Sequence, residues 1–244
     1  MGTVIAVTSG KGGTGKTSIT SGVAAALAKM GLRVLCIDMD IGLRNLDISL
    51  GLNDRALMDF SDVALGHCPL ARAAVAHPEL DGLYLLTAPM SLSPYLSEIR
   101  VRAMLDRARA AYDYILIDSP AGLGAGFRLA VCGADRAIVV ATNDASSLRD
   151  AQRTVTELSA IRDIHLVMNR IQPKLLRKLR TTIDDAMDAA GLPLIGVVPE
   201  DPQVMLCANL GQPLLVRNRR GAAQACWNIA HRLEGWHVPI MRIR

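Results

Sequence analysis

Near its start the chain carries the stretch Gly10-Lys11-Gly12-Gly13-Thr14-Gly15-Lys16-Thr17. It fits the pattern G-x-x-x-x-G-K-[ST], a glycine-rich loop that holds phosphate groups between a strand and a helix. Residues 3–8 are β-branched and apolar, as is typical of a buried strand. Apolar residues then recur at helical spacing from Ile19 to Met30, and Gly31 is a helix stop signal. The loop therefore lies in the context that its chemistry requires.

Each residue type in this loop has a chemical use. Glycines let the backbone curl so that successive amide groups point at phosphates, and the start of the helix adds partial positive charge. We expect Lys16 to reach the β- and γ-phosphates and the Thr17 hydroxyl to bind Mg²⁺. The predicted nucleotide-binding residues here are Gly10, Lys11, Gly12, Gly13, Thr14, Gly15, Lys16, Thr17 and Ser18.

The composition predicts a single domain with an aliphatic core. Of 244 residues, 50% are hydrophobic and 3% are aromatic, so the core must consist of Leu, Ile, Val, Ala and Met. A net charge of +4 is too small to argue by itself for nucleic acid. Five cysteines without a C-x-x-C pair argue against a disulfide framework and against a zinc or iron–sulfur site. We expect a cytoplasmic protein with reduced thiols and no signal peptide.

Strands alternate with helices along the predicted chain. Further strands are expected at residues 33–38, 82–88, 112–118, 135–141, 164–170 and 194–198, and helices at 96–111, 173–190 and 202–210. This alternation is typical of an α/β fold with a doubly wound, mostly parallel sheet and helices on both faces. We expect a single domain over residues 1–235 and a short apolar and basic tail, residues 236–244.

Two of these expectations concern single helices. Ile99, Met104 and Leu105 are expected to face inward from the helix at residues 96–111. A capping box, Ser147-Leu148-Arg149-Asp150, is expected to open another helix.

Carboxylates end two of the predicted strands. Asp38 and Asp40 come at the end of the strand at residues 33–38, where ligands bind in doubly wound sheets. Asp118 follows four apolar or aromatic residues, as in a Walker-B strand, whose carboxylate holds the magnesium shell. The alternatives are a solvated acidic turn for the first pair and a capping carboxylate for Asp118.

Taken together, the motifs resemble the ParA/MinD family of P-loop ATPases. Residues 11–17, K-G-G-T-G-K-T, are similar to the family's deviant P-loop, and residues 38–47, D-M-D-I-G-L-R-N-L-D, are similar to its MinD branch. I-D-S-P-A-G at residues 117–122 resembles the second switch, and V-P-E-D at 198–201 resembles the loop that lines the adenine pocket. The resemblance runs from the first strand to about Leu233.

The resemblance implies roles for individual residues. It implies that Lys11 crosses a dimer interface to the other subunit's nucleotide, and that Asp40 positions the attacking water. The implied catalytic residues are Lys11, Lys16 and Asp40, and the implied metal-site residues are Thr17, Asp38 and Asp118. The implied adenine-pocket residues are Asn169, Arg170, Pro199, Glu200 and Asp201. For Asn169 a turn-forming role is the alternative.

The resemblance also implies a function. It implies an ATPase with ATP and Mg²⁺ as cofactors, an ATP-dependent homodimer, and hydrolysis triggered by a protein partner of the MinC/MinE kind. The implied role is placement of the cell-division site. A ParA-type DNA-partition ATPase and a flagellar-number regulator are alternatives in the same family, and a non-hydrolysing nucleotide-gated scaffold is an alternative of another class.

Two basic segments bear on the surface that such a protein would bind. Residues 217–220, expected to begin the last helix, are either a solvated turn or a contact to anionic lipid or DNA phosphates. The family usually ends in a basic membrane-binding helix, whereas the tail here is short and interrupted by Pro239. We expect either a weak anchor on the inner face of the cell membrane, aided by dimer avidity, or a tail packed on the body.

Overall fold

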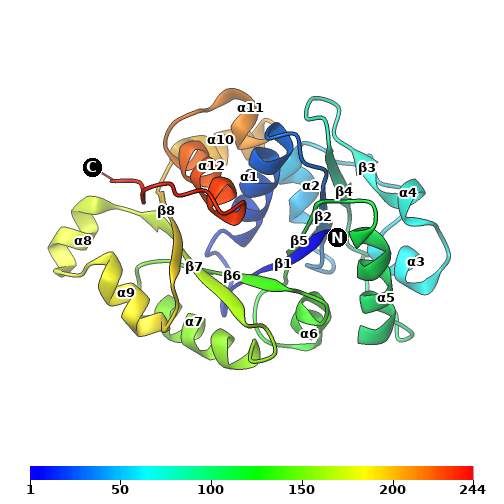
Figure 1. Cartoon of the computed structure of the whole chain (residues 1–244), viewed down its shortest axis with the longest axis horizontal. Helices are drawn as coiled ribbons and strands as arrows, with labels where there is room; N and C mark the ends of the chain where they lie inside the picture. Colours follow the sequence, from blue (N-terminus) through cyan, green and yellow to red (C-terminus); the bar gives the residue numbers. More distant parts are fainter. Residues whose placement is uncertain (244) are drawn as a thin grey trace.

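A computed structural model describes residues 1–243 and contains an eight-stranded sheet (Figure 1); Arg244, the end of the predicted tail, lies outside the described residues. The strands are β1 (Thr3–Thr8), β2 (Val34–Asp38), β3 (Val75–Ala76), β4 (Leu83–Leu86), β5 (Tyr114–Asp118), β6 (Arg136–Ala141), β7 (Asp163–Ile171) and β8 (Leu194–Pro199). Their order is β3-β4-β2-β5-β1-β6-β7-β8. Only the β3–β4 pair is antiparallel among the described strands.

Helices cover both faces of the sheet, as Figure 1 shows. One layer consists of α1 (Lys16–Lys29), α2 (Asn45–Leu50), α10 (Pro202–Asn209), α11 (Leu214–Arg217) and α12 (Ala222–Leu233). The other layer consists of α3 (Phe60–Leu65), α4 (Leu70–Ala73), α5 (Glu98–Arg109), α6 (Ala125–Val131), α7 (Ala145–Glu157) and α9 (Ile183–Ala190). Helix α8 (Pro173–Leu179) lies at one end of the molecule. The prediction of a doubly wound α/β fold is confirmed.

The apolar strands are explained by burial on both faces. In β1, Ile5 packs into the layer that contains α1, and its neighbour Val4 packs into the opposite layer. The same alternation holds in β2 for Cys36 and Leu35. Since successive strand side chains point to opposite faces, a strand covered on both sides must be apolar at every position.

Strand register brings the predicted acidic residues together. β5 lies between β1 and β2, and Asp118 is paired in register with Asp38 of β2 and with Val7 of β1. The loop that follows β1 therefore starts beside two carboxylates. Since the three strands are parallel, these groups share the carboxyl edge of the sheet, where doubly wound proteins bind ligands.

The predicted helix at residues 173–190 is wrong, because the structure has two helices there, α8 and α9. Arg180 adopts a left-handed conformation, with φ of 53°, and ends α8. Thr182 then caps α9, accepting a hydrogen bond from the amide of Asp185, whose carboxylate accepts one from the amide of Thr182. This reciprocal cap inside the segment starts a second helix.

Three smaller expectations are also wrong. The cap of α7 is Asp144, whose carboxylate accepts a hydrogen bond from the amide of Ser147, so Ser147 lies inside the helix. Ile99 is 79% exposed, because the buried stripe of α5 runs through Val101, Met104, Leu105 and Ala108 at spacings of three and four. Residues 217–220 do not begin the last helix: Arg217 ends α11, residues 218–220 follow it, and α12 begins at Ala222.

His77 is a buried histidine in the connection between β3 and β4. Its Nδ1 accepts hydrogen bonds from the amides of Glu79 and Leu80, and its Nε2 lies 3.0 Å from the carbonyl oxygen of Leu50, at the end of α2. The neutral ring protonated on Nε2 satisfies all three contacts. Burial lowers the pKa of His77.

Replacing His77 by alanine is expected to lower the free energy of unfolding at pH 7.5 by about 1–3 kcal/mol, because buried amides lose their acceptor. Since its pKa is lowered on folding, His77 contributes stability above its unfolded pKa and loses that contribution as pH falls below about 6.5. The wild-type minus variant difference in urea unfolding should therefore shrink between pH 7.5 and 5. H237A, at an exposed histidine, is the control; a difference independent of pH would contradict the prediction.

Candidate nucleotide-binding site

The glycine-rich loop connects β1 to α1 and needs glycine for two reasons. Gly13 and Gly15 have φ of 79° and 91°, a conformation that side chains disfavour. A Cβ on Gly15 would also lie 2.3 Å from Nδ2 of Asn169. Gly15 is the N-cap of α1 and no side chain caps this helix, so its first amide groups are free to bind an anion.

Lys16 is buried at the start of α1, where its positively charged ammonium has no ion-pair partner in the described chain. Its ammonium donates a hydrogen bond to the Ser9 hydroxyl at 3.1 Å, and no ion pair is present for it within residues 1–243. Burial lowers the pKa of Lys16, while attraction from Asp118 and Asp40 acts to raise it. A buried ammonium beside uncapped amides favours an anionic ligand in this loop.

The predicted metal-site residues lie together. The Thr17 hydroxyl donates to Asp118 Oδ2 at 2.6 Å, and Thr20, which was not predicted, donates to Oδ1 at 3.3 Å. Burial raises the pKa of Asp118 to about 7, against the opposing hydrogen bond from Thr17. Asp38 accepts hydrogen bonds from the amides of Asp40 and Leu46, and burial raises its pKa to about 6.

This set of oxygen donors fits Mg²⁺ carried by a nucleotide. Hydroxyl and carboxylate oxygens are ligands that Mg²⁺ prefers, and it is usually held by one or two carboxylates with phosphate and water completing its shell. In residues 1–243 no group of three His, Cys, Asp or Glu side chains could hold a metal ion. Thr17 and Asp118 therefore suit a metal that arrives with phosphates.

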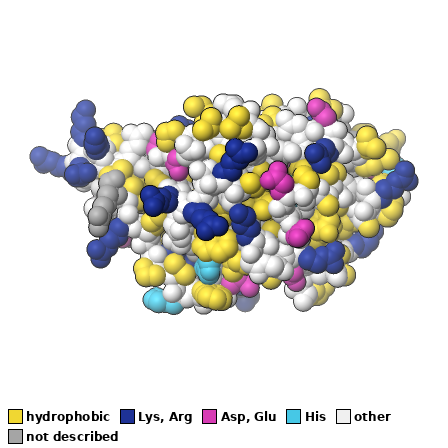
Figure 2. All heavy atoms as spheres, turned by 90° about the horizontal axis from the view of Figure 1, so that it is seen from above, with side chains coloured by type: hydrophobic (Ala, Val, Ile, Leu, Met, Phe, Trp, Pro, Cys, Tyr) yellow, Lys and Arg dark blue, Asp and Glu magenta, His cyan; other side chains and the backbone are white. Residues whose placement is uncertain are grey.

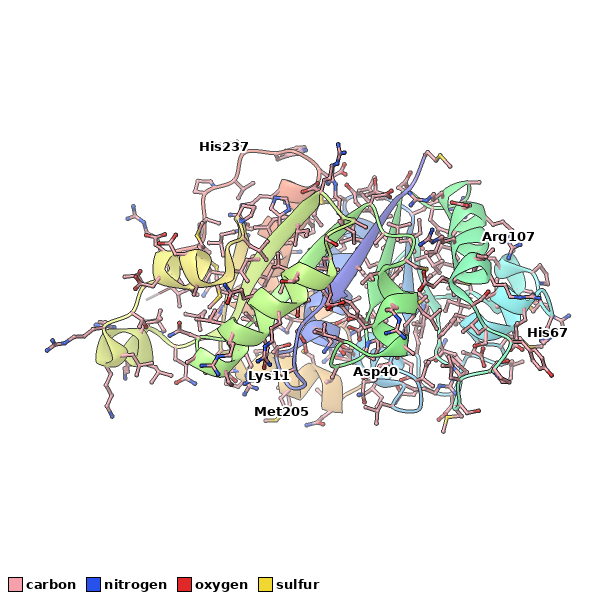
Figure 3. The ribbon with its side chains drawn as sticks, turned by 90° about the horizontal axis from the view of Figure 1, so that it is seen from below. Lys11, Asp40, His67, Arg107, Met205 and His237 are labelled. Carbon is pink, nitrogen blue, oxygen red and sulfur yellow. The ribbon has the colours of Figure 1, made fainter. Side chains whose placement is uncertain are left out.

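Asp40 lies at the mouth of this site. Its amide is held by Asp38, and its own carboxylate has no hydrogen-bond partner within the described part of the chain. Burial raises the pKa of Asp40, and Lys16 acts to lower it. In Figure 3 Asp40 and Lys11 lie along the same edge of the molecule. The Asp40 carboxylate is unengaged within the described chain and lies close enough to Lys16 for the ammonium to act on its pKa.

Lys11 is engaged within its own chain. Its ammonium donates to Asp144 Oδ1 and to the Ser146 hydroxyl, both at 2.9 Å, at the start of α7. Burial acts to raise the pKa of Asp144, but hydrogen bonds from two hydroxyls, Lys11 and an amide hold it well below its usual range. No local signal predicted this pair, because its members are 133 residues apart.

The predicted adenine-pocket residues line one pocket of about 420 Å³ beside the loop. They are Asn169, Arg170, Pro199, Glu200 and Asp201, and Gly13, Gly15 and Ser18 line the same pocket. Asn169 is buried and donates from Nδ2 to the carbonyl of Thr14 at 2.7 Å, so it also tethers the loop. Arg170 pairs with Glu200 at 2.8 Å. The pocket adjoins the phosphate loop, as a bound nucleotide requires.

Comparison with known proteins decides the family. The model of the CobQ/CobB/MinD/ParA nucleotide binding domain matches residues 5–214. The chain belongs to this family. It is 39% identical over 246 residues to the septum site-determining protein MinD of Synechocystis, covering 99% of this chain and 92% of that protein.

Two solved structures of family members are similar over nearly the whole chain. The MinC:MinD cell division protein complex of Aquifex aeolicus matches with a TM-score of 0.91 and 37% identity, covering 98% of each chain. The MinD protein of Pyrococcus horikoshii, complexed with Mg-ADP, matches with a TM-score of 0.84 and 29% identity, covering 96% of each chain. None of the described helices is both long and apolar enough to span a membrane.

Proposed function

We propose that this chain is an ATPase of the MinD kind that acts in placement of the cell-division site. The observation that carries the proposal is the meeting of a glycine-rich loop, the buried Lys16 and the two carboxylates that end β2 and β5. Its similarity to MinD proteins, one of them complexed with Mg-ADP, supports nucleotide and Mg²⁺ as ligands. Residues 1–235 would form the ATPase domain.

Different residues of the site have different roles in phosphoryl transfer. The loop amides and Lys16 bind the phosphates, and the pocket at Asn169 and Pro199–Asp201 binds the base. Thr17 and Asp118, with Asp38 nearby, hold Mg²⁺, which when bound neutralises phosphate charge. Asp40 orients the attacking water. Because phosphoryl transfer depends mainly on positioning and charge, one carboxylate suffices for this task.

The partners follow from the same resemblance. Similarity to the MinD chain of a MinC:MinD complex supports a protein partner of the MinC kind. We propose that ATP drives homodimerisation and that hydrolysis, triggered by such a partner, reverses it. We favour an anionic membrane as the surface to which the chain binds. The alternative is a partition role on the nucleoid. Binding assays with vesicles and with DNA would distinguish the two.

The K11A variant tests the proposal that ATP drives dimerisation. In the monomer Lys11 is held by Asp144 and Ser146, so its loss leaves the loop amides and Lys16 in place. We expect the variant to bind ADP with unchanged affinity but to lose the dimer that Mg-ATP induces, measured by light scattering after size exclusion. Its stability should fall by no more than about 1 kcal/mol, as for an exposed ion pair.

The control for this test is K29A, which removes a lysine at the other end of α1. It should dimerise with Mg-ATP like the wild type. A K11A protein that still dimerises with Mg-ATP would show that Lys11 does not act across the interface. A wild-type chain that releases no phosphate from ATP, alone or with its partner, would overturn the proposed function.

A further inference from the structure

A cavity of about 460 Å³ is bordered by α1, α12 and the segment that begins in α11, in one helical layer of the domain. Its lining combines two cations, Lys29 and Arg219, with the indole of Trp227 and the side-chain amides of Asn218 and Gln224. The cavity shares no lining residue with the pocket that adjoins the phosphate loop. Its volume is that of a site for a small molecule.

The two cations of this cavity have no acidic partner. The ammonium of Lys29, in the last turn of α1, donates a hydrogen bond to the carbonyl of Leu215, which leaves two of its three N–H groups for a ligand. Arg219 is exposed, and within residues 1–243 no ion pair joins either cation to a carboxylate. No Asp or Glu of the described chain lines the cavity. The cavity therefore attracts anions.

Trp227 gives the cavity an aromatic wall. The residue is half-buried in α12 and packs against the core cluster that contains α1. The centre of its ring lies 5.2 Å from the centre of the His231 ring, one helical turn further along. Leu215 and Ala223, both buried, add apolar surface to the lining. The apolar part of a ligand would thus find an aromatic side chain that the helix already holds in place.

The described part of the C-terminal tail does not fill this cavity. Arg232 of α12 donates hydrogen bonds to the carbonyl of Val238 at 3.0 Å and of Pro239 at 2.7 Å. The tail then borders a different groove, which it shares with α8 and which is lined by Ile240, Met241, Ile243 and Leu176. Of the two possibilities that the sequence left for the tail, its described residues are packed on the body. The cavity at Trp227 is left to a ligand from solution.

The face around the cavity is also rich in cations. Figure 2 is seen from the side on which Figure 1 draws α11 and α12, and it shows Lys and Arg side chains among hydrophobic ones on this face. Three exposed arginines, Arg217, Arg219 and Arg220, lie in the segment between α11 and α12 or at its start. Only Arg219 of the three lines the cavity. The other two add to the potential that draws an anion toward it.

We propose that this cavity binds a small organic anion with a flat apolar body, such as an aromatic carboxylate. The carboxylate would accept hydrogen bonds from Lys29 and Arg219, and the ring would pack against the indole of Trp227. Duplex DNA would use the exposed arginines alone, whereas a cavity with an aromatic wall suits a small ring. The inference is independent of the proposed function, because the nucleotide site and this cavity are lined by different residues.

The probe for this site is 2-naphthoate, and its neutral analogue 2-naphthalenemethanol has the same rings without the charge. Fluorine NMR of the full chain labelled with 5-fluorotryptophan locates the binding, because the chain has two tryptophans, Trp227 and Trp236, and W236F identifies the signal of Trp227. We expect 2-naphthoate to shift the Trp227 signal saturably, with and without Mg-ADP. The neutral analogue should bind about tenfold or more weakly, because it lacks the charged hydrogen bonds.

Two variants, K29Q and R219Q, remove the cations one at a time. Each is expected to weaken the binding of 2-naphthoate about tenfold, the effect of losing one hydrogen bond to a charged group, and to leave the weaker binding of 2-naphthalenemethanol unchanged. The matched control is R100Q, which removes an exposed arginine of α5 in the other helical layer and should bind the anion like the wild type. Circular dichroism, measured on every variant, should match the wild type.

The outcomes are distinct. A Trp227 signal that does not respond to 2-naphthoate would overturn the proposal, and so would wild-type affinity in both K29Q and R219Q or an equal loss in R100Q. Displacement of 2-naphthoate by plasmid DNA would assign the cations to nucleic acid and would also overturn it. Phosphate release from ATP is measured without 2-naphthoate. A chain that releases no phosphate but binds the anion at Trp227 would contradict the proposed function and leave this site intact.

Discussion

Replacing Lys16 by glutamine is expected to weaken Mg-ATP binding about 100-fold or more, the cost of removing one partner from a buried charged pair. The ammonium is buried at the start of α1 and has only the Ser9 hydroxyl as a hydrogen-bond partner in the described chain. The phosphates would therefore supply its main counter-charge. Isothermal titration with Mg-ADP and a non-hydrolysable ATP analogue measures the loss.

The control for K16Q is a substitution of another lysine on the same helix, α1. K29Q changes an exposed lysine that donates to the carbonyl of Leu215, and it should bind nucleotide like the wild type. Because the wild-type ammonium is buried and its pKa is lowered, K16Q should retain most of its stability without ligand. A K16Q protein that binds Mg-ATP as tightly as the wild type would show that the phosphates lie elsewhere.

D40N is expected to reduce the rate of ATP hydrolysis about 100-fold or more, the range for loss of a group that assists proton transfer. The amide has the shape of the carboxylate but cannot accept a proton from the attacking water. Nucleotide binding should persist, because the loop amides, Lys16 and Asp118 are untouched. Single-turnover phosphate release, with the activating partner present, separates the chemical step from binding.

The matched control is D54N, which changes an exposed aspartate in the loop after α2. Asp54 has a φ of 58°, a conformation that asparagine tolerates well, so the substitution should be neutral. Unchanged turnover in D40N would remove Asp40 from the mechanism. Loss of nucleotide binding in D40N, with D54N normal, would assign Asp40 to the binding of Mg-ATP and contradict a role confined to hydrolysis.

Much of the site could be predicted because its parts are local. The loop, Lys16 and Thr17 form a continuous pattern between a strand and a helix, and the apolar run before Asp118 marks a buried strand with a carboxylate at its end. Thr20 could also have been found, since it follows Thr17 by about one helical turn and donates to the same carboxylate. Such signals need only the periodicity of neighbouring residues.

Other features had no such signal. Ile99 belongs to a helical pattern, yet the neighbouring elements pack on a different stripe of α5 and leave it in solvent. The break between α8 and α9 depends on a left-handed Arg180, which an unbroken helical pattern does not indicate. His77 lies in the short connection between β3 and β4, and it is buried because the end of α2 packs against its ring.

By itself, the sequence determined the alternation of strands and helices, the phosphate loop and the identity of the acidic residues that end β2 and β5. Only the tertiary structure decided that Asp38 and Asp118 lie side by side, that Lys11 contacts Asp144, and that α8 and the tail border one groove. The physical reason is the distance along the sequence between the residues that determine each feature. Local patterns follow from backbone geometry and the burial of one face, whereas contacts between distant segments depend on how the whole sheet packs.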